Sequence, residues 1–138
     1  MSNISGNDYA GIFYAGGHGP LWDLVDDANS IQLIESMHVA GRPVAAVCHA
    51  PAVLCNAKTA NGEPLVDGKK VTGFSNSKED AVELNDSVPF LLETKLTELG
   101  DDDSKGDDWA SYTLTDGNVI TGQNPASASA ETMLAMLK

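Results

Sequence analysis

The sequence predicts an α/β fold in which helices cover both faces of a parallel sheet. Short apolar runs bounded by turn residues occupy 10–15, 43–48 and 69–74, and such runs are typical of buried strands. Segments with helical periodicity separate these runs, and an alternation of strands and helices favours parallel pairing. Two β-rich runs around Asp116-Gly117 add a C-terminal hairpin to this pattern.

The chain begins with a predicted strand, a loop and a helix. The run AGIFYA at 10–15 predicts the strand, and GGHGP after it predicts the loop. Two caps are possible for the helix, Asp26-Asp27 or Asn29-Ser30, and Gly41 stops it. Its expected apolar face comprises Ile31, Leu33, Ile34 and Met37.

The middle of the chain repeats this order. The run PVAAVC at 43–48 predicts the second strand, and APAVLCNAKTA at 50–60 predicts a helix that ends near Asn61-Gly62. After a turn at Asp67-Gly68, the run KKVTGF at 69–74 predicts the third strand. Residues 77–100 then predict two helices, because Pro89 suits the first turn of a new helix.

The last quarter contains an acidic loop, a hairpin and a terminal helix. Gly100 ends the preceding helix, and the run from Asp101 to Asp103 indicates a solvated loop. SYTLTDGNVITG at 111–122 predicts a hairpin with a type I′ turn at Asp116-Gly117. Asn124-Pro125 is expected to open the terminal helix.

Composition limits the classes of function. The chain has 138 residues and a net charge of −12, so we expect a single domain over 1–138 and neither nucleic acid nor an anionic membrane as a partner. The N-terminal residues do not resemble a secretory signal, and the two cysteines indicate reduced thiols of a cytoplasmic protein. GxGxxG, P-loop, CxxC and HExxH motifs are absent from the sequence, so we expect no cofactor and no metal.

The second predicted strand ends abruptly in Cys48 and His49. A strand that turns sharply into a helix exposes the turning residue, which is the geometry of a nucleophile elbow. At a helix N-terminus, backbone N–H groups and the helix dipole favour the thiolate of Cys48. We therefore interpret Cys48 as a nucleophile and Cys55, inside the next predicted helix, as a packing residue.

The loop GGHG is expected to meet Cys48, because ligands gather beyond the carboxyl ends of parallel strands. Gly16 and Gly17 permit close backbone approach, and the Gly17 N–H is a natural oxyanion donor together with that of His49. His18 is expected to line the same pocket.

His49 is also a candidate base or proton shuttle. A Cys–His pair usually needs a third group that orients the imidazole. Two carboxylates just beyond the third predicted strand are placed for this role, Glu79 and Asp80, and the residues alone do not distinguish them.

The sequence resembles the ThiJ/PfpI superfamily in four segments: YAGGHGPLWDL, PVAAVCHAPAVL, GKKVTGFSNSKE and WASYTLTDGNVITGQNPASA. These segments cover nearly the whole chain in the order that the family has. The resemblance is narrower to the branch of heat-shock chaperones with glyoxalase III activity. It implies a flavodoxin-like core similar to that of class I glutamine amidotransferases.

The resemblance also implies roles for residues. Cys48 matches the family's nucleophile and His49 its partner, while the pattern GF(T/S)-x-x-x-E places the third member on Glu79 rather than Asp80. The implied reaction is a cofactor-free conversion of methylglyoxal and related small 2-oxoaldehydes to D-lactate-type products through a hemithioacetal on Cys48. Deglycation of early adducts is a further implied activity.

Family members normally have another α/β segment before the strand at 10–15, including a strand of the sheet and a glutamate that contacts the nucleophile. We therefore expect a chain shortened at its N-terminus, whose sheet edge is covered in a homo-oligomer or by a partner chain. Two alternative functions stay open. One is a stress-related holdase chaperone with little or no catalysis, and the other is a cysteine amidase or peptidase of the same superfamily.

Overall fold

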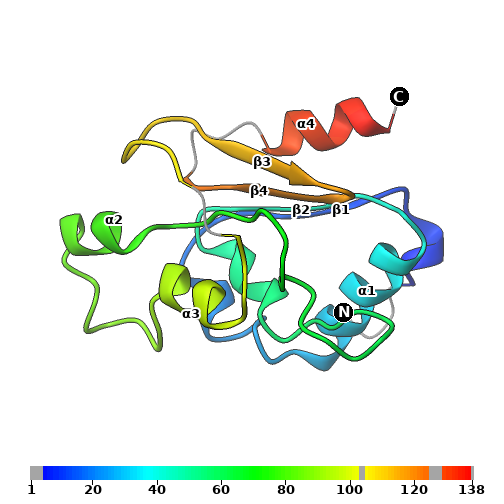
Figure 1. Cartoon of the computed structure of the whole chain (residues 1–138), viewed down its shortest axis with the longest axis horizontal. Coiled ribbons are helices and arrows are strands. Elements are labelled where there is room, and N and C mark those ends of the chain that lie inside the picture. The colour runs from blue at the N-terminus through cyan, green and yellow to red at the C-terminus, as the bar shows by residue number, and fades with distance from the viewer. Residues whose placement is uncertain (1–4, 103–104, 125–128, 138) are drawn as a thin grey trace.

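The computed structural model of the chain describes residues 5–102, 105–124 and 129–137 (Figure 1). The strands are β1 (Ile12–Tyr14), β2 (Val44–Val47), β3 (Thr113–Asp116) and β4 (Val119–Gly122). The α-helices are α1 (Ala28–Val39), α2 (Asn76–Ala81), α3 (Leu92–Glu98) and α4 (Ser129–Met136). Short 3₁₀ helices are η1 (Gly6–Asp8), η2 (Gly19–Leu21) and η3 (Ala50–Leu54).

The strands form a mixed sheet in the order β1-β2-β4-β3. β1 and β4 flank β2 in parallel, whereas β3 and β4 are antiparallel. The register places Tyr14 opposite Ala46 and Val47 opposite Gly122, so β1, β2 and β4 end at one edge of the sheet. The prediction of a flavodoxin-like α/β sheet with a C-terminal hairpin is confirmed, and the hairpin supplies the strand beside β2.

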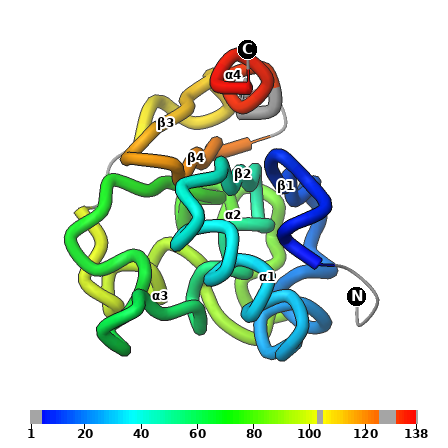
Figure 2. Tube along the Cα trace, turned by 90° about the vertical axis from the view of Figure 1, so that its right-hand side faces the viewer, coloured from blue at the N-terminus to red at the C-terminus, as the bar shows by residue number. Residues whose placement is uncertain are grey.

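Helices cover both faces of this sheet. α4 packs against β2 and β4 on one face, and α1, α2, α3 and η3 lie on the other (Figures 1 and 2). The central strand β2 is buried on both faces, as expected for a parallel strand between two layers of helices. The GGHG loop and Cys48 therefore meet at the carboxyl ends of neighbouring strands.

The cap of α1 is Asp27. Its carboxylate accepts a hydrogen bond from the Ser30 N–H at 2.7 Å, which satisfies one of the free donors of the first turn. The apolar face is buried as predicted at Leu33, Ile34 and Met37. Gly41 follows the helix end with φ 73°, a conformation that glycine adopts without strain.

The prediction of a strand at 69–74 is wrong. In this segment the Thr72 N–H donates to the side-chain oxygen of Thr121 at 2.9 Å, and the Lys70 N–H donates to the carboxylate of Asp116 at 2.8 Å. The Phe74 N–H donates to the Cys48 carbonyl at 2.8 Å. These N–H groups bond to two side chains and to the carbonyl that follows β2. The segment is therefore attached to the sheet but does not form the regular backbone hydrogen bonds of a strand.

The prediction of a helix over 50–60 is also wrong in its extent. Only η3 forms, with hydrogen bonds such as Cys55 N–H to the Ala52 carbonyl at 3.0 Å that span three residues instead of four. Beyond it, Lys58 and Pro64 pair in an isolated antiparallel bridge, and Gly62 turns the loop between them with φ 82°.

The hairpin forms where predicted, but its turn differs. Asp116 pairs with Val119, so the turn residues are Gly117 and Asn118. Gly117 has φ 62°, whereas Asn118 does not have a positive φ. A type I′ turn needs positive φ at both positions and a type II′ turn needs it only at the first, so this turn follows the type II′ pattern.

The predicted division of 77–100 into two helices is confirmed by α2 and α3. Pro89 lies before α3 rather than in its first turn, and Gly100 follows α3 with φ 92°. The expected opening of the terminal helix at Pro125 lies outside the described residues. Within the described ranges, no helix is both long and apolar enough to span a membrane.

Candidate active site

Cys48 occupies the sharp turn between β2 and η3. Its φ of 64° lies in the left-handed region, which residues with a side chain rarely adopt. The Cys48 N–H donates to the Gly122 carbonyl at 2.9 Å, and its carbonyl accepts from the Phe74 N–H at 2.8 Å. These bonds hold the strained turn on both sides, and the residue is 6% exposed.

The loop after β1 approaches this turn closely. A Cβ atom at Gly16 would lie 3.0 Å from the Cβ of Cys48, so glycine is what permits the approach. The backbone N–H groups of Gly17 and His49 lie near the Cys48 sulfur and lower the pKa of its thiol. The structure thus brings together Cys48 and the two backbone donors that the sequence indicated.

The His49 imidazole lies between Cys48 and Glu79. Its Nδ1 is 3.4 Å from the Cys48 Sγ, and its Nε2 is 2.6 Å from the Glu79 Oε2. The His49 and Glu79 side chains are 1% and 2% exposed. Asp80, the alternative carboxylate, is exposed and hydrogen-bonds to Asn85 instead. Of the two acidic neighbours, Glu79 is therefore the one that meets the imidazole.

His18 contacts the same carboxylate from the solvent side. Its Nε2 lies 3.2 Å from the Glu79 Oε1, and its ring centroid lies 3.9 Å from that of His49. The His18 side chain is 34% exposed, so it is the accessible member of the group. The sequence indicated that His18 lines the pocket, but no pattern in it pointed to the contact with Glu79.

Burial governs the protonation of the Cys48–His49 pair. It raises the pKa of the Cys48 thiol, although the Gly17 and His49 N–H groups oppose this shift. It lowers the pKa of His49, while the hydrogen bond and charge of Glu79 oppose that shift. The backbone N–H groups therefore favour the thiolate as expected, but burial outweighs them, and η3 is a short 3₁₀ helix instead of the expected α-helix. The two shifts favour a thiol and a neutral imidazole over the ion pair.

Aromatic side chains cover one face of the His49 ring. Phe74 stacks on it with centroids 4.2 Å apart and an interplanar angle of 30°. Trp109 packs edge-on against Phe74 at 5.7 Å and is 51% exposed. The sequence indicated Phe74 only as part of a strand, so this stack was found from the structure alone.

Lys78 is a buried cation beside the site. Its Nζ donates to the Gln123 carbonyl at 2.7 Å and lies 4.9 Å from the centre of the Phe74 ring. Its charge lowers the pKa of Cys48 and so opposes the effect of burial on that thiol. Sequence reasoning missed this residue because lysine side chains are mostly exposed, and no local pattern marks a buried one.

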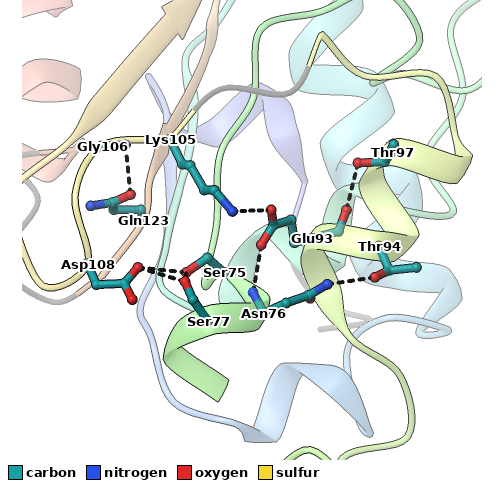
Figure 3. Close-up of polar contacts among 10 residues, drawn as sticks. All are labelled: Ser75, Asn76, Ser77, Glu93, Thr94, Thr97, Lys105, Gly106, Asp108 and Gln123. Carbon is teal, nitrogen blue, oxygen red and sulfur yellow. Dashed lines mark hydrogen bonds and ion pairs between the residues drawn. The ribbon is translucent and has the colours of Figure 1, made fainter. Parts of the chain in front are cut away.

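Hydrogen bonds hold the start of α2, the helix that carries Glu79 (Figure 3). The Asn76 N–H donates to the Glu93 carboxylate at 2.6 Å, which ties α2 to α3. The Ser77 hydroxyl donates to the Asp108 carboxylate at 2.8 Å, which ties α2 to the loop before β3. The Glu79 carboxylate is thus placed by contacts from two other parts of the chain.

Among the residues that the structure describes, one group offers donor atoms suited to a metal ion. The ligand atoms of His18, His49 and Glu79 all lie within 4.8 Å of one another. Two imidazoles and a carboxylate are a donor set that divalent transition metals accept.

The chain is similar to known proteins in sequence and in fold. The chain matches the model of the DJ-1/PfpI family over residues 1–138. It is 32% identical to "Glyoxalase 3" of Candida albicans, over 97% of the chain and 60% of that protein. It is 34% identical to the "Glutathione-independent glyoxalase HSP31" of Saccharomyces cerevisiae, over 91% of the chain and 55% of that protein.

Solved structures give the same result. The Francisella tularensis Rapid Encystment Protein 24 kDa superposes with a TM-score of 0.95 at 38% identity, over 99% of this chain and 62% of that one. Glyoxalase III from Candida albicans superposes with a TM-score of 0.91 at 34% identity, over 99% and 61%. The chain thus spans between 55% and 62% of the length of these relatives.

Proposed function

The chain belongs to the DJ-1/PfpI family, and from that premise we propose that it is a glutathione-independent, glyoxalase III-like enzyme. Its substrates are methylglyoxal and related small 2-oxoaldehydes. Cys48 is the nucleophile, His49 the proton shuttle and Glu79 the carboxylate that positions His49. The proposal depends above all on the hydrogen-bond chain from the Cys48 Sγ through both nitrogens of His49 to Glu79. The similarity to proteins named as glyoxalases supports the reaction class.

The first step uses His49 as a general base, because burial favours the protonated thiol of Cys48. The Cys48 sulfur attacks the aldehyde carbon while the His49 Nδ1 accepts the thiol proton, and Glu79 stabilises the resulting imidazolium through Nε2. The carbonyl electrons move onto the substrate oxygen, which the N–H groups of Gly17 and His49 stabilise. Protonation of that oxygen gives the hemithioacetal.

The second step moves a proton between two carbon atoms. His49 removes the proton from the former aldehyde carbon and returns it to the neighbouring keto carbon, which leaves a thioester of a 2-hydroxy acid on Cys48. Water then cleaves the thioester and regenerates the thiol. The net change is the addition of one water to the 2-oxoaldehyde, so the balance requires no outside oxidant or reductant.

The glycine loop binds the substrate in this proposal. Gly16 keeps the loop close to Cys48, Gly17 supplies an oxyanion donor, and His18 contacts the entering substrate. The close approach at Gly16 and the exposure of His18 support these assignments.

The test is methylglyoxal consumption with lactate detection, in metal-free buffer without glutathione. The wild-type chain is expected to turn over the substrate, and Cys48→Ala is expected to fall to the background rate. Cys55→Ala, which removes the other buried thiol, serves as the matched control and retains turnover. Turnover that survives Cys48→Ala would contradict the assignment of Cys48 as the nucleophile. A wild-type chain that does not turn over methylglyoxal, although its Cys48 still reacts with an alkylating reagent, would contradict the proposed enzymatic activity.

We also propose that a second copy or a partner chain covers the β1 edge. Among the described strands β1 lies at the end of the sheet, and its Phe13 is 37% exposed, which supports association at this edge. Light scattering after size exclusion is expected to give more than the mass of one chain if a second copy covers this edge, and a monomer at low concentration would contradict the second copy. The free thiols of Cys48 and Cys55 support a reducing, cytoplasmic setting.

A further inference from the structure

His18, His49 and Glu79 converge on one point from three separate elements. His18 precedes η2, His49 precedes η3, and Glu79 lies in the first turn of α2. His49 and Glu79 are 30 residues apart and His18 and Glu79 are 61 residues apart, so the convergence is a product of the tertiary fold.

The spacing of the donor atoms fits a small cation. The two oxygens of Glu79 face different imidazoles, at 2.6 Å from the His49 Nε2 and 3.2 Å from the His18 Nε2. Ligand atoms around a tetrahedral zinc ion stand about 3.3 Å apart, given metal–ligand bonds of about 2.0–2.1 Å. Since all three donors already lie within 4.8 Å of one another, side-chain adjustment alone brings them to ligand spacing.

The ligand types and the solvent exposure of these three side chains also favour a bound cation. Imidazole nitrogen and carboxylate oxygen are ligands that zinc prefers, and three protein ligands leave a coordination position for water. His49 and Glu79 are almost fully buried, whereas His18 is 34% exposed and gives solvent a route to the group. The net charge of −12 also raises the local concentration of cations.

We propose that His18, His49 and Glu79 bind a divalent cation of the zinc class, and that the bound cation switches off the chemistry of Cys48. The second half of this inference rests on the proposed function. A cation on the His49 Nε2 leaves the ring proton on Nδ1, which then has no lone pair to accept the thiol proton. It also occupies the Glu79 oxygen that would stabilise the imidazolium.

Zinc titration of the chelator-treated chain, followed by calorimetry, tests the site directly. The wild-type chain is expected to show a tight site of one ion per chain, and His18→Gln is expected to weaken it by more than about tenfold. His38→Gln is the matched control, because His38 bonds to Asn118 away from the group and its loss leaves zinc affinity unchanged. Cys48→Ser is expected to retain the site. Equal affinity in wild type and His18→Gln would overturn the inference, since binding would then reside on other groups.

Cobalt(II) in place of zinc identifies the ligands by their spectrum. We expect the cobalt-loaded chain to show the visible absorption bands of a four-coordinate Co(II) ion, without the sulfur-to-metal charge-transfer band that a thiolate ligand would add. A charge-transfer band that disappears in Cys48→Ser would overturn it, because Cys48 would then be a ligand. Circular dichroism of each variant confirms that the fold is intact.

Methylglyoxal turnover with and without one equivalent of zinc separates the two proposals. Turnover in the metal-free chain that zinc suppresses, with less suppression in His18→Gln, supports both. Zinc binding by a chain that never turns over methylglyoxal contradicts the proposed function and leaves the metal site in place. Turnover that stoichiometric zinc does not change overturns the inhibitory half of the inference.

Discussion

Cys48 combines a left-handed backbone with a thiol whose pKa is raised by burial. Its φ of 64° is maintained by backbone hydrogen bonds to Gly122 and Phe74. The N–H groups of Gly17 and His49 and the charge of Lys78 lower the same pKa, so these neighbours oppose the effect of burial on the thiol.

The first prediction concerns Lys78. Because its positive charge lowers the pKa of Cys48, Lys78→Met is expected to raise that pKa further and to shift the alkylation profile of Cys48 to higher pH. At any fixed pH below the pKa of the Cys48 thiol, Cys48 is therefore alkylated more slowly in the variant than in the wild type. Iodoacetamide labelling followed by mass spectrometry measures the profile. Lys95→Met, which replaces a lysine near Cys55, is the control, and an unshifted profile in Lys78→Met would refute the prediction.

The second prediction compares two neighbouring carboxylates. Glu79→Gln removes the charge that stabilises the His49 imidazolium, so turnover of methylglyoxal is expected to fall about 100-fold or more. It also lowers the pKa of His49 further, because the Glu79 bond and charge raise that pKa in the wild type. Asp80→Asn changes the same charge one residue away on the exposed side and is expected to retain turnover. Equal losses in the two variants would mean that net charge, not position, matters.

At the scale of elements, the site is a contact between the loop after β1 and the turn after β2. The two strands are parallel neighbours, so their carboxyl ends lie side by side. Gly16 brings the loop to the turn, and α2 adds the carboxylate of Glu79. The position of the Gly17 N–H beside the sulfur therefore depends on the absence of a side chain at Gly16.

The third prediction tests that contact. Gly16→Ala places a Cβ 3.0 Å from the Cys48 Cβ and 3.5 Å from the Val47 carbonyl oxygen, which pushes the loop away from the turn. Turnover is expected to fall by about tenfold or more, because donors displaced by a fraction of an ångström lose catalytic effect. Gly41→Ala is the control. Its free energy of unfolding is expected to fall by about 1 kcal/mol because alanine is strained at a φ of 73°, but the added Cβ meets no other atom and lies away from the site. Loss of turnover in proportion to stability in both variants would argue against a specific role for Gly16.

At the scale of the whole molecule, the core contains a second thiol whose ionisation opposes folding. Burial raises the pKa of Cys55 from 9.0 to about 12. Between these values the unfolded chain releases the thiol proton while the folded chain keeps it. The folded state then binds more protons, so the free energy of unfolding decreases as pH rises above about 9.

The fourth prediction follows from this linkage. Cys55→Ala removes the ionisation, so its free energy of unfolding is expected to fall less steeply than that of the wild type from pH 9 upward. The difference in slope has an upper limit of about 1.4 kcal/mol per pH unit for one group. Urea unfolding at several pH values measures both curves, and the constant offset near neutral pH reports the lost packing. Parallel curves above pH 9 would refute the prediction.

Much of the fold was predictable because it depends on short-range pattern. The apolar run before Cys48 made a buried strand, the periodic residues of α1 made a helix, and glycines marked the ends of α1 and α3. The position of Cys48 at a strand end also followed from sequence, because a run of small apolar residues that stops at a polar pair is a local signal. Each of these features is decided by residues within a few turns of one another.

The rest depended on contacts between distant parts of the chain. Residues 69–74 have the composition of a strand, but side chains of the hairpin take their N–H groups. Glu79 and Asp80 are adjacent and chemically alike, and only the packing of α2 decided which one meets His49. The approach of His18 to that carboxylate and the raised pKa of Cys48 have the same origin, since burial and non-local partners are properties of the folded chain. Sequence by itself determined the strand-end thiol and its imidazole neighbour, whereas the tertiary structure decided which charges surround them.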